Sequence, residues 1–285
     1  MRAAVVRCFG APENIQTVAN WELPKVMKAQ QVLIKVKAAG INPVDTYVRS
    51  GAYGVLPSLP YIPGRDGSGI VEEVGEAVEH VRKGDRVWFL AEANGSAAEY
   101  TLSTRVFPLP EEVTFTEGAA IGVPYLTAYR ALFMKGALKP ASKILIHGAS
   151  GGVGLAAVQL ATWKGYDVVG TAGFDLIVEM AAHINLETDL SLLAKNGRIC
   201  IVGNRGETTI NARALMTLET SIYGVSLGHS TQEEYYKMAQ KVNQLFSETK
   251  FRPVVQREYS LEQLQQAHVD IMQSYGALGN LVVAV

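Results

Sequence analysis

The sequence has little cysteine, little net charge and no long apolar run, and each shortage excludes a class of protein. Only Cys8 and Cys200 stand among 285 residues, and neither belongs to a pair motif. We therefore expect no disulfide framework and no four-thiolate zinc lobe, and a cytoplasmic setting. The net charge of -1 supplies no basic field for nucleic acid. Because apolar runs are short throughout, we expect neither a membrane span nor a signal peptide.

The pattern of the chain changes near residue 116. Before it, short strand patterns such as the alternation of Val32, Ile34 and Val36 are separated by glycine turns. Such a pattern is typical of a compact, barrel-type β domain. After it, residues 116–133 have helical spacing, residues 142–173 read strand, glycine-rich turn, helix and strand, and the tail returns to strands. We expect one domain from residues 1–118 with 254–285, and a second from 119–253.

The glycine-rich turn carries the strongest chemical signal in the sequence. The apolar strand Ile144–Ile146 is followed by Ala149-Ser150-Gly151-Gly152-Val153-Gly154, and an apolar helix begins at once. In a dinucleotide-binding βαβ unit, Gly151 would let the backbone approach a pyrophosphate and Gly154 would let the helix pack closely. The helix N-terminus would supply N–H groups to the phosphate. The alternative is a tight strand–helix turn in an α/β protein that binds no nucleotide.

The second strand of this unit favours NADP(H) over NAD(H). An NAD-binding unit usually has an acidic residue at the end of that strand, about 20 residues after the turn, on the ribose hydroxyl. Here the strand ends in Thr171-Ala172-Gly173, which contains no carboxylate. Asp175 is better placed as the start of the next strand.

A series of motifs runs in a fixed order along nearly the whole chain. They are AAGINPVDTYVRSGAY (38–53), YIPGRDGSGIVEEVG (61–75), KGDRV (83–87), GAAIGVPYLTAYRAL (118–132), HGASGGVG (147–154), VGNRG (202–206) and GALGNLVV (276–283). The series resembles the zinc-free medium-chain dehydrogenase/reductase group, and within it the quinone oxidoreductases of the zeta-crystallin type. The resemblance implies an α/β protein with a GroES-like, β-barrel-type catalytic domain and a Rossmann domain. It also implies NADPH-dependent reduction of a quinone without a metal, in a homo-oligomer (dimer or tetramer).

The resemblance further implies a set of cofactor contacts, with Asn42 and Tyr47 nearest the nicotinamide and no general acid or base. The contacts are Tyr47, Ser150, Gly151, Gly152, Val153, Gly173, Asn185, Val202, Gly203, Asn204, Arg205, Val225, Ser226 and Leu227. Structural alternatives remain for several of them. Tyr47 could be a core aromatic residue, Asn185 a turn residue that ends the strand segment 177–185, and Arg205 a solvated charge.

The chain departs from zinc-containing relatives where they hold their metal. Asn42 and Pro43 stand where zinc alcohol dehydrogenases have a cysteine ligand, and Arg65-Asp66 stands where they have His-Glu. The five histidines are scattered, and His147 is expected to be a hydrogen-bonded structural residue. A catalytic zinc needs three protein ligands in one place, and we expect no such place.

One segment departs from the family as a whole. Related proteins have roughly three dozen residues, enough for one αβα step, where this chain has only Phe174 between Gly173 and Asp175. Strand patterns 167–173 and 175–180 are therefore adjacent in sequence, and parallel neighbours need a crossover. We expect a rearranged sheet edge in an internally shortened form of the family, which retains the phosphate turn but binds NADPH weakly or folds poorly.

Two other functions remain open from the sequence. An enone or alkenal reductase would share the fold and the hydride donor, and the substrate pocket would decide between the two. A catalytically impaired protein with a structural, crystallin-like role or AU-rich RNA binding is the alternative of another class. The near-neutral charge gives RNA binding no independent support.

Overall fold

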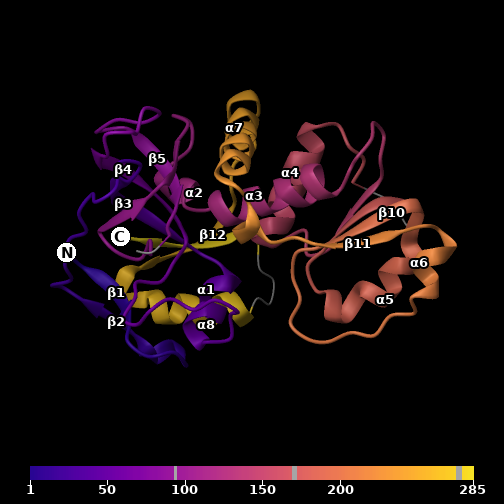
Figure 1. Ribbon diagram of the computed structural model, residues 1–285, viewed down its shortest axis with the longest axis horizontal. Helices are drawn as coiled ribbons and strands as arrows, with labels where there is room; N and C mark the ends of the chain where they lie inside the picture. Colours follow the sequence, from indigo (N-terminus) through magenta and orange to yellow (C-terminus); the bar gives the residue numbers. More distant parts are fainter. Residues whose placement is uncertain (93–94, 169–171, 274–277) are drawn as a thin grey trace. The chain divides into compact units, whose positions relative to one another are not determined.

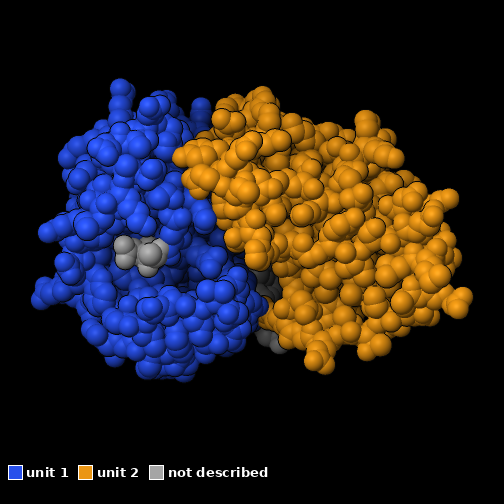
Figure 2. Space-filling view, in the orientation of Figure 1, with its two compact units in different colours: residues 1–123, 252–285 blue, residues 124–251 orange. Residues whose placement is uncertain are grey.

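The computed structural model describes all residues except 93–94, 169–171 and 274–277. The chain divides into two compact units, shown in different colours in Figure 2. Unit 1 contains Met1–Val123 and Arg252–Val285, and unit 2 contains Pro124–Phe251. The domain boundaries expected from the sequence, after residues 118 and 253, stay a prediction.

Unit 1 is built on a mostly antiparallel sheet whose strand order is β12-β13-β3-β4-β5-β7, with β6 paired to β3 (Figure 1). Buried and exposed residues alternate from Ile34 to Lys37 of β3, and Val32, Ile34 and Val36 lie in the core as their spacing predicts, although Leu33 between them is buried too. The strands are β3 (Val32–Ile41), β4 (Asp66–Val74), β5 (Arg86–Leu90), β6 (Tyr100–Ser103), β7 (Arg105–Pro108), β12 (Val255–Ser260) and β13 (Asn280–Ala284), beside a separate pair β1 (Ala3–Val6) and β2 (Ile15–Val18).

Unit 1 also contains several short helices, which connect the strands and pack against one another and the sheet. Helices α1 and α8 pack against each other, and Leu264 and Ala267 of α8 join a buried cluster with Ile41 and Val283. The helical elements are η1 (Pro12–Asn14), α1 (Pro43–Ser50), α2 (Phe115–Gly118), η4 (Leu261–Gln263) and α8 (Leu264–Gln273). Helix α3 (Gly122–Tyr129) begins in unit 1 and continues into unit 2, followed by the π-helical turn η2 (Arg130–Lys135).

Unit 2 contains a parallel sheet with the order β11-β10-β9-β8. Figure 1 shows α4 and α5 on opposite sides of this sheet. Its strands are β8 (Ile144–Ile146), β9 (Phe174–Glu179), β10 (Leu193–Ile201) and β11 (Ser221–Gly224), and its helices are α4 (Gly152–Trp163), α5 (Ala182–Leu192), α6 (Arg213–Thr217), η3 (Leu227–His229) and α7 (Gln232–Glu248).

Asn185 does not end a strand, so that expectation is wrong. Strand β9 stops at Glu179, and Asn185 lies in α5. The segment is helical because Ala182, Leu186 and Leu190 recur every four residues and are all buried on one face. They pack against the apolar face of the sheet, which includes Ile177.

The expected second strand of the βαβ unit forms no ladder within the described residues. Asp167 makes an isolated parallel bridge with Lys143, just before β8, and residues 169–171 lie outside the described part of the chain. The Ile144 amide, at the start of β8, donates to the Asp167 carbonyl, whereas β8 pairs with β9 along its opposite edge. Asp167 and β9 therefore lie on opposite edges of β8.

The strand order identifies what the sheet has lost. Dinucleotide-binding sheets usually have the order 3-2-1-4-5-6. With β8 as strand 1, the order β8-β9-β10-β11 corresponds to 1-4-5-6. Among the described residues no strand corresponds to strand 3, and only the bridge of Asp167 corresponds to strand 2, while the other strands keep their usual neighbours. The helices of the described residues include none that is long and apolar enough to cross a membrane.

We expect Phe174, the residue at the junction, to be essential for the stability of unit 2. Its side chain is 1% exposed and packs with Ile177, Leu186 and Ile199. Phe174→Ala should lower the free energy of unfolding by ~3–5 kcal/mol, because it leaves a cavity in the core. Ile184→Ala, at a 71% exposed position on α5, should change it by less than ~0.5 kcal/mol. Urea unfolding followed by circular dichroism measures both, and equal effects would contradict this packing.

Candidate functional site

The glycine-rich turn after β8 leaves helix N–H groups free to bind an anion. Gly148 has a φ of +57°, and the Gly151 amide donates to the Gly148 carbonyl oxygen at 3.0 Å, which closes the turn. Gly151 is the N-cap of α4, and no side chain accepts a hydrogen bond there. Because the first turn of a helix has N–H groups without intrahelical partners, this end of α4 suits a phosphate.

Gly154 is required by the close packing of α4 on this turn. A Cβ atom at Gly154 would lie 2.1 Å from the Gly148 carbonyl oxygen, a distance at which the backbone would have to move. At Gly151 the nearest atom to an added Cβ is the same oxygen at 3.5 Å, an ordinary contact. The two glycines therefore have different roles, because Gly154 permits the fold of the turn and Gly151 leaves its outer side open.

The other loops at the carboxyl ends of the parallel strands gather beside this turn. Val202 and Gly203, which follow β10, donate backbone hydrogen bonds to the Glu179 carbonyl at the end of β9. Val225, which follows β11, donates to the Ile201 carbonyl. Adjacent loops at the carboxyl edge of a parallel sheet form the usual ligand site. The predicted groups Ser150–Val153, Val202–Arg205 and Val225–Leu227 thus share one edge of the sheet.

Asn185 joins this edge from α5, through a hydrogen bond to the end of β9. Its Nδ2 atom donates to Glu179 Oε1 at 3.2 Å, and the Ala181 amide donates to the same oxygen. Arg205 is exposed, and its backbone N–H donates to His183 Nδ1 at 3.2 Å.

Gly173 does not share the site with the other predicted residues of unit 2. It precedes the first residue of β9, and its amide donates to the Leu192 carbonyl at 2.8 Å, just before β10. Those are the amino ends of the strands, whereas the phosphate turn follows a carboxyl end. Its φ of +73° serves the turn that leads into β9. Thr171, at the expected end of the second strand, lies outside the described residues.

In unit 1, Asn42 is held in a buried hydrogen-bond network at the start of α1. Its Nδ2 donates to Asp66 Oδ2 at 2.9 Å, and its backbone N–H donates to Asp45 Oδ2 at 2.8 Å. The amide of Val123, in the first turn of α3, donates to both Asp66 oxygens at 2.8 and 3.0 Å. Asn42, Asp45 and Asp66 are each at most 5% exposed. The network fixes the orientation of the Asn42 amide.

Burial sets the protonation of this network. Desolvation raises the pKa of Asp66 to about 8, although the hydrogen bonds from Asn42 and Val123 act against it. Desolvation likewise raises the pKa of Asp45 to about 6. Asp66 therefore holds a proton through much of the neutral range, and Asn42 lies beside a mostly uncharged acid.

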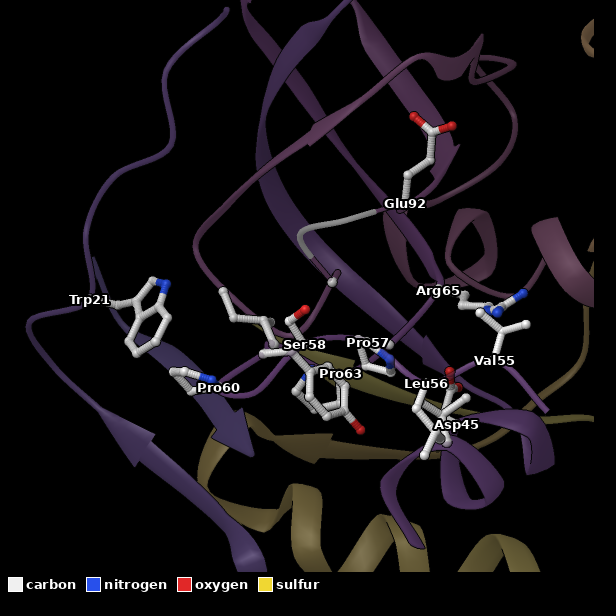
Figure 3. A pocket seen from close by; sticks show the side chains of 15 residues that line it. Trp21, Asp45, Val55, Leu56, Pro57, Ser58, Pro60, Pro63, Arg65 and Glu92 are labelled. Atoms are coloured by element: carbon white, nitrogen blue, oxygen red, sulfur yellow. The ribbon is translucent and has the colours of Figure 1, made fainter. Parts of the chain in front are cut away.

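One face of α1 borders a pocket of about 450 Å³ within unit 1. Figure 3 shows Trp21 and Pro60 at one end of it and Asp45, Leu56 and Arg65 at the other. The Tyr61 hydroxyl is shielded from solvent and has no hydrogen-bond partner among the described residues, and its pKa is raised to about 12, chiefly by burial. Tyr47 lies on α1 with its side chain half-buried. The pocket can take a small planar molecule against its apolar lining.

The network around Asn42 does not fit a catalytic zinc. Asn42 offers an N–H group that already donates to Asp66, and the Asp66 oxygens accept backbone hydrogen bonds. The neighbouring Arg65 is a cation, with its guanidinium carbon 5.7 Å from the centre of the Tyr53 ring. Neither a cysteine nor a histidine completes the usual set of ligands.

His147, Glu179 and Asp189 form a cluster that the sequence did not reveal. His147 Nε2 lies 2.8 Å from Asp189 Oδ1 and 3.4 Å from Glu179 Oε2. The expectation that His147 is hydrogen-bonded is confirmed. The expectation that no place brings three metal-binding side chains together is wrong, since among the described residues this one group does. The only hint in the sequence was that a polar residue ends each of two neighbouring apolar strands.

Comparison with known proteins defines first the class and then the group. Residues 28–111 match the family described as the alcohol dehydrogenase GroES-like domain, and residues 157–283 match the zinc-binding dehydrogenase family. A mycobacterial protein solved as a complex with NADPH superposes with a TM-score of 0.89 at 25% identity, and the match covers 100% of both chains. These matches define a medium-chain dehydrogenase/reductase and confirm the expected α/β fold.

The chain belongs to the quinone oxidoreductase group of this family. It is 43% identical to the quinone oxidoreductase of Lama guanicoe, with 99% of this chain and 97% of the relative covered. It is 40% identical to the human quinone oxidoreductase, with the same coverage. Both alignments extend over 321 positions, against 285 residues here. The relatives thus have several dozen residues without a counterpart in this chain.

We expect Asp66 to make stability depend on pH. Its pKa is raised from 3.8 to about 8 in the folded protein, so between these values the folded state binds a proton that the unfolded state releases. The free energy of unfolding must then fall as pH rises through this window, by at most ~1.4 kcal/mol per pH unit for one proton. Asp66→Asn should flatten the slope between pH 6 and 8, measured by urea unfolding at each pH. The exposed Glu76→Gln is the control, and an unchanged slope in Asp66→Asn would contradict the assignment.

Proposed function

We propose that this protein transfers a hydride from NADPH to a quinone. The observation that carries the proposal is the set of loops at one edge of the parallel sheet in unit 2, centred on an open helix N-terminus. It is supported by the quinone oxidoreductase relatives and by the NADPH complex of a protein with the same fold.

Different residues at the carboxyl edge of the parallel sheet would bind different parts of the cofactor. Ser150–Val153 would bind the pyrophosphate through backbone N–H groups, and Val202–Arg205 and Val225–Leu227 would line the adjacent loops. Asn185, held by Glu179, would offer an oriented side-chain amide. Arg205, exposed on its loop, suits a phosphate. The nicotinamide, when bound, supplies the hydride, and Asn42 and Tyr47 would orient it.

The pocket in unit 1 supplies a site for the quinone. Its apolar lining, including Val48, Val55 and Leu56, suits a ring. A quinone that displaces the side chains over the Tyr61 hydroxyl would accept a hydrogen bond from it. A quinone accepts electrons without a Lewis acid, so the misfit of zinc at Asn42 and Asp66 is consistent with this substrate class. Protons for the quinol can come from solvent. An alkenal would need more activation, and turnover of ortho-quinones against alkenals with NADPH separates the two substrates.

A titration of NADPH by fluorescence tests the cofactor site. Gly151→Ala should weaken NADPH binding at least tenfold, because the methyl group would project where the pyrophosphate approaches. It should keep wild-type stability, because its Cβ meets only an ordinary contact, whereas Gly154→Ala should destabilise the turn. We also expect the wild-type Kd to be weaker than micromolar, because the segment missing between Gly173 and Asp175 would lie near the adenosine phosphate. A micromolar or tighter Kd with normal turnover would contradict this weakening, and equal binding by Gly151→Ala would contradict the cofactor site.

Tyr61→Phe tests the quinone pocket separately. The variant should raise KM for the quinone about five- to tenfold, the loss of roughly one hydrogen bond, and leave the Kd for NADPH unchanged. It should fold with at least wild-type stability, because the buried hydroxyl has no partner to lose. Steady-state kinetics with a varied quinone concentration measures the effect. An unchanged KM would remove Tyr61 from the substrate site.

The remaining properties suggested by the sequence stay proposals. The protein would form a homo-oligomer, either a dimer or a tetramer. It would be located in the cytoplasm and would bind AU-rich RNA. Light scattering on the purified chain determines the number of subunits. Filter retention of an AU-rich RNA at low salt, with and without NADPH, tests the last property.

A further inference from the structure

The cluster of His147, Glu179 and Asp189 lies where three elements of unit 2 meet. His147 follows β8, Glu179 is the last residue of β9, and Asp189 lies on α5. The His147 amide donates to the Val178 carbonyl at 3.0 Å, so the backbone sets the position of the imidazole beside β9. One ligand atom from each of the three residues lies within 4.8 Å of the other two. The three donors are therefore brought together by the fold.

The two carboxylates have oxygens without partners at the centre of this cluster. Glu179 is 0% exposed and Asp189 is 1% exposed. Glu179 Oε1 accepts two hydrogen bonds, but within the described part of the chain neither Glu179 Oε2, 3.4 Å from His147 Nε2, nor Asp189 Oδ2 has a hydrogen-bond partner. A buried charge normally has a partner or binds a metal.

We propose that His147, Glu179 and Asp189 bind a divalent transition-metal cation of the Zn²⁺ type. Nitrogen and carboxylate ligands around Zn²⁺ lie about 2.0–2.2 Å from the metal, so they are separated by roughly 3–4 Å in a tetrahedral site. The distance of 3.4 Å from His147 Nε2 to Glu179 Oε2 lies in this range. The distance of 2.8 Å from His147 Nε2 to Asp189 Oδ1 is that of a hydrogen bond, which a cation between the two side chains would replace and lengthen. The cation would compensate both buried carboxylates.

The set of ligands selects the type of cation. One imidazole with two carboxylates suits Zn²⁺ and its transition-metal neighbours, whereas Mg²⁺ prefers oxygen ligands alone. The His147 side chain is 27% exposed, so this side of the cluster has access to solvent for entry and for a fourth ligand. This site lies in unit 2, and the place where zinc dehydrogenases hold their metal falls on Asn42 and Asp66 in unit 1.

The bound cation would join β8, β9 and α5 at the edge that carries the phosphate turn. Glu179 would bind the metal through Oε2 while Oε1 continues to hold Asn185 and the Ala181 amide. The metal would thus act as a structural tie in a sheet that lacks its usual outer strands. This role does not require that the protein reduce quinones.

Zn²⁺ titration against a chromophoric chelator tests the proposal on the full chain. The wild type should bind one equivalent, and Asp189→Asn and His147→Gln should each bind at least tenfold more weakly. His229→Gln, a change at an exposed histidine, should bind as the wild type does, and Mg²⁺ should not compete. Zn²⁺ should also raise the unfolding temperature of the wild type and not that of Asp189→Asn.

A second test needs no variant and so does not depend on whether the variants fold. Wild-type crystals are soaked in Zn²⁺, and anomalous diffraction at the zinc absorption edge locates the bound metal. The expected result is a zinc atom within about 2.3 Å of the three ligand atoms. A wild-type chain that binds no Zn²⁺ at ten micromolar would overturn the proposal, and a shared proton between the carboxylates would then explain their proximity. Zinc found elsewhere, or equal affinity in Asp189→Asn, would overturn it as well.

Discussion

The direct parallel pairing of β8 with β9 is the interaction on which the rest of unit 2 depends. It places the phosphate turn after Ile146 beside the end of β9, where the Glu179 carbonyl accepts hydrogen bonds from Val202 and Gly203. The loops after β10 and β11 then follow at the same edge, because parallel strands bring their carboxyl ends together. Without this pair, neither the open N-terminus of α4 nor the cluster around His147 would have its neighbours.

The αβα segment that longer relatives have belongs to the edge of the sheet, and the pair at its centre is present without it. Strands 1 and 4 of the usual order are spatial neighbours although many residues separate them in longer relatives. The pairing of β8 with β9 therefore does not require strand 3. The consequence falls on Gly173, which is now at the amino ends of the strands and away from the phosphate turn.

Buried acids determine the chemistry of both units. In unit 1, desolvation outweighs the hydrogen bonds from Asn42 and Val123 and raises the pKa of Asp66 to about 8, while Asp66 accepts a hydrogen bond from the Asn42 side chain. In unit 2, burial raises the pKa of Asp189 to about 6, with a further contribution from Glu179. Burying an acid costs free energy. In unit 1, Asp66 accepts a hydrogen bond from Asn42, and in unit 2, Glu179 accepts one from Asn185. Both asparagines are assigned to binding sites.

Local sequence determined the glycine turn, the strand before it and the helix after it, because φ, close packing and periodicity are properties of neighbouring residues. It also determined the absence of a segment after Gly173, and the order of motifs indicated the family. The four-residue spacing of Ala182, Leu186 and Leu190 likewise encodes the helix that contains Asn185. Only the tertiary structure decided the place of Gly173 and brought His147 together with Glu179 and Asp189. Those two features depend on which strands are neighbours and on burial against α5. Such contacts join residues that are 32 and 42 positions apart in sequence, so no local pattern encodes them.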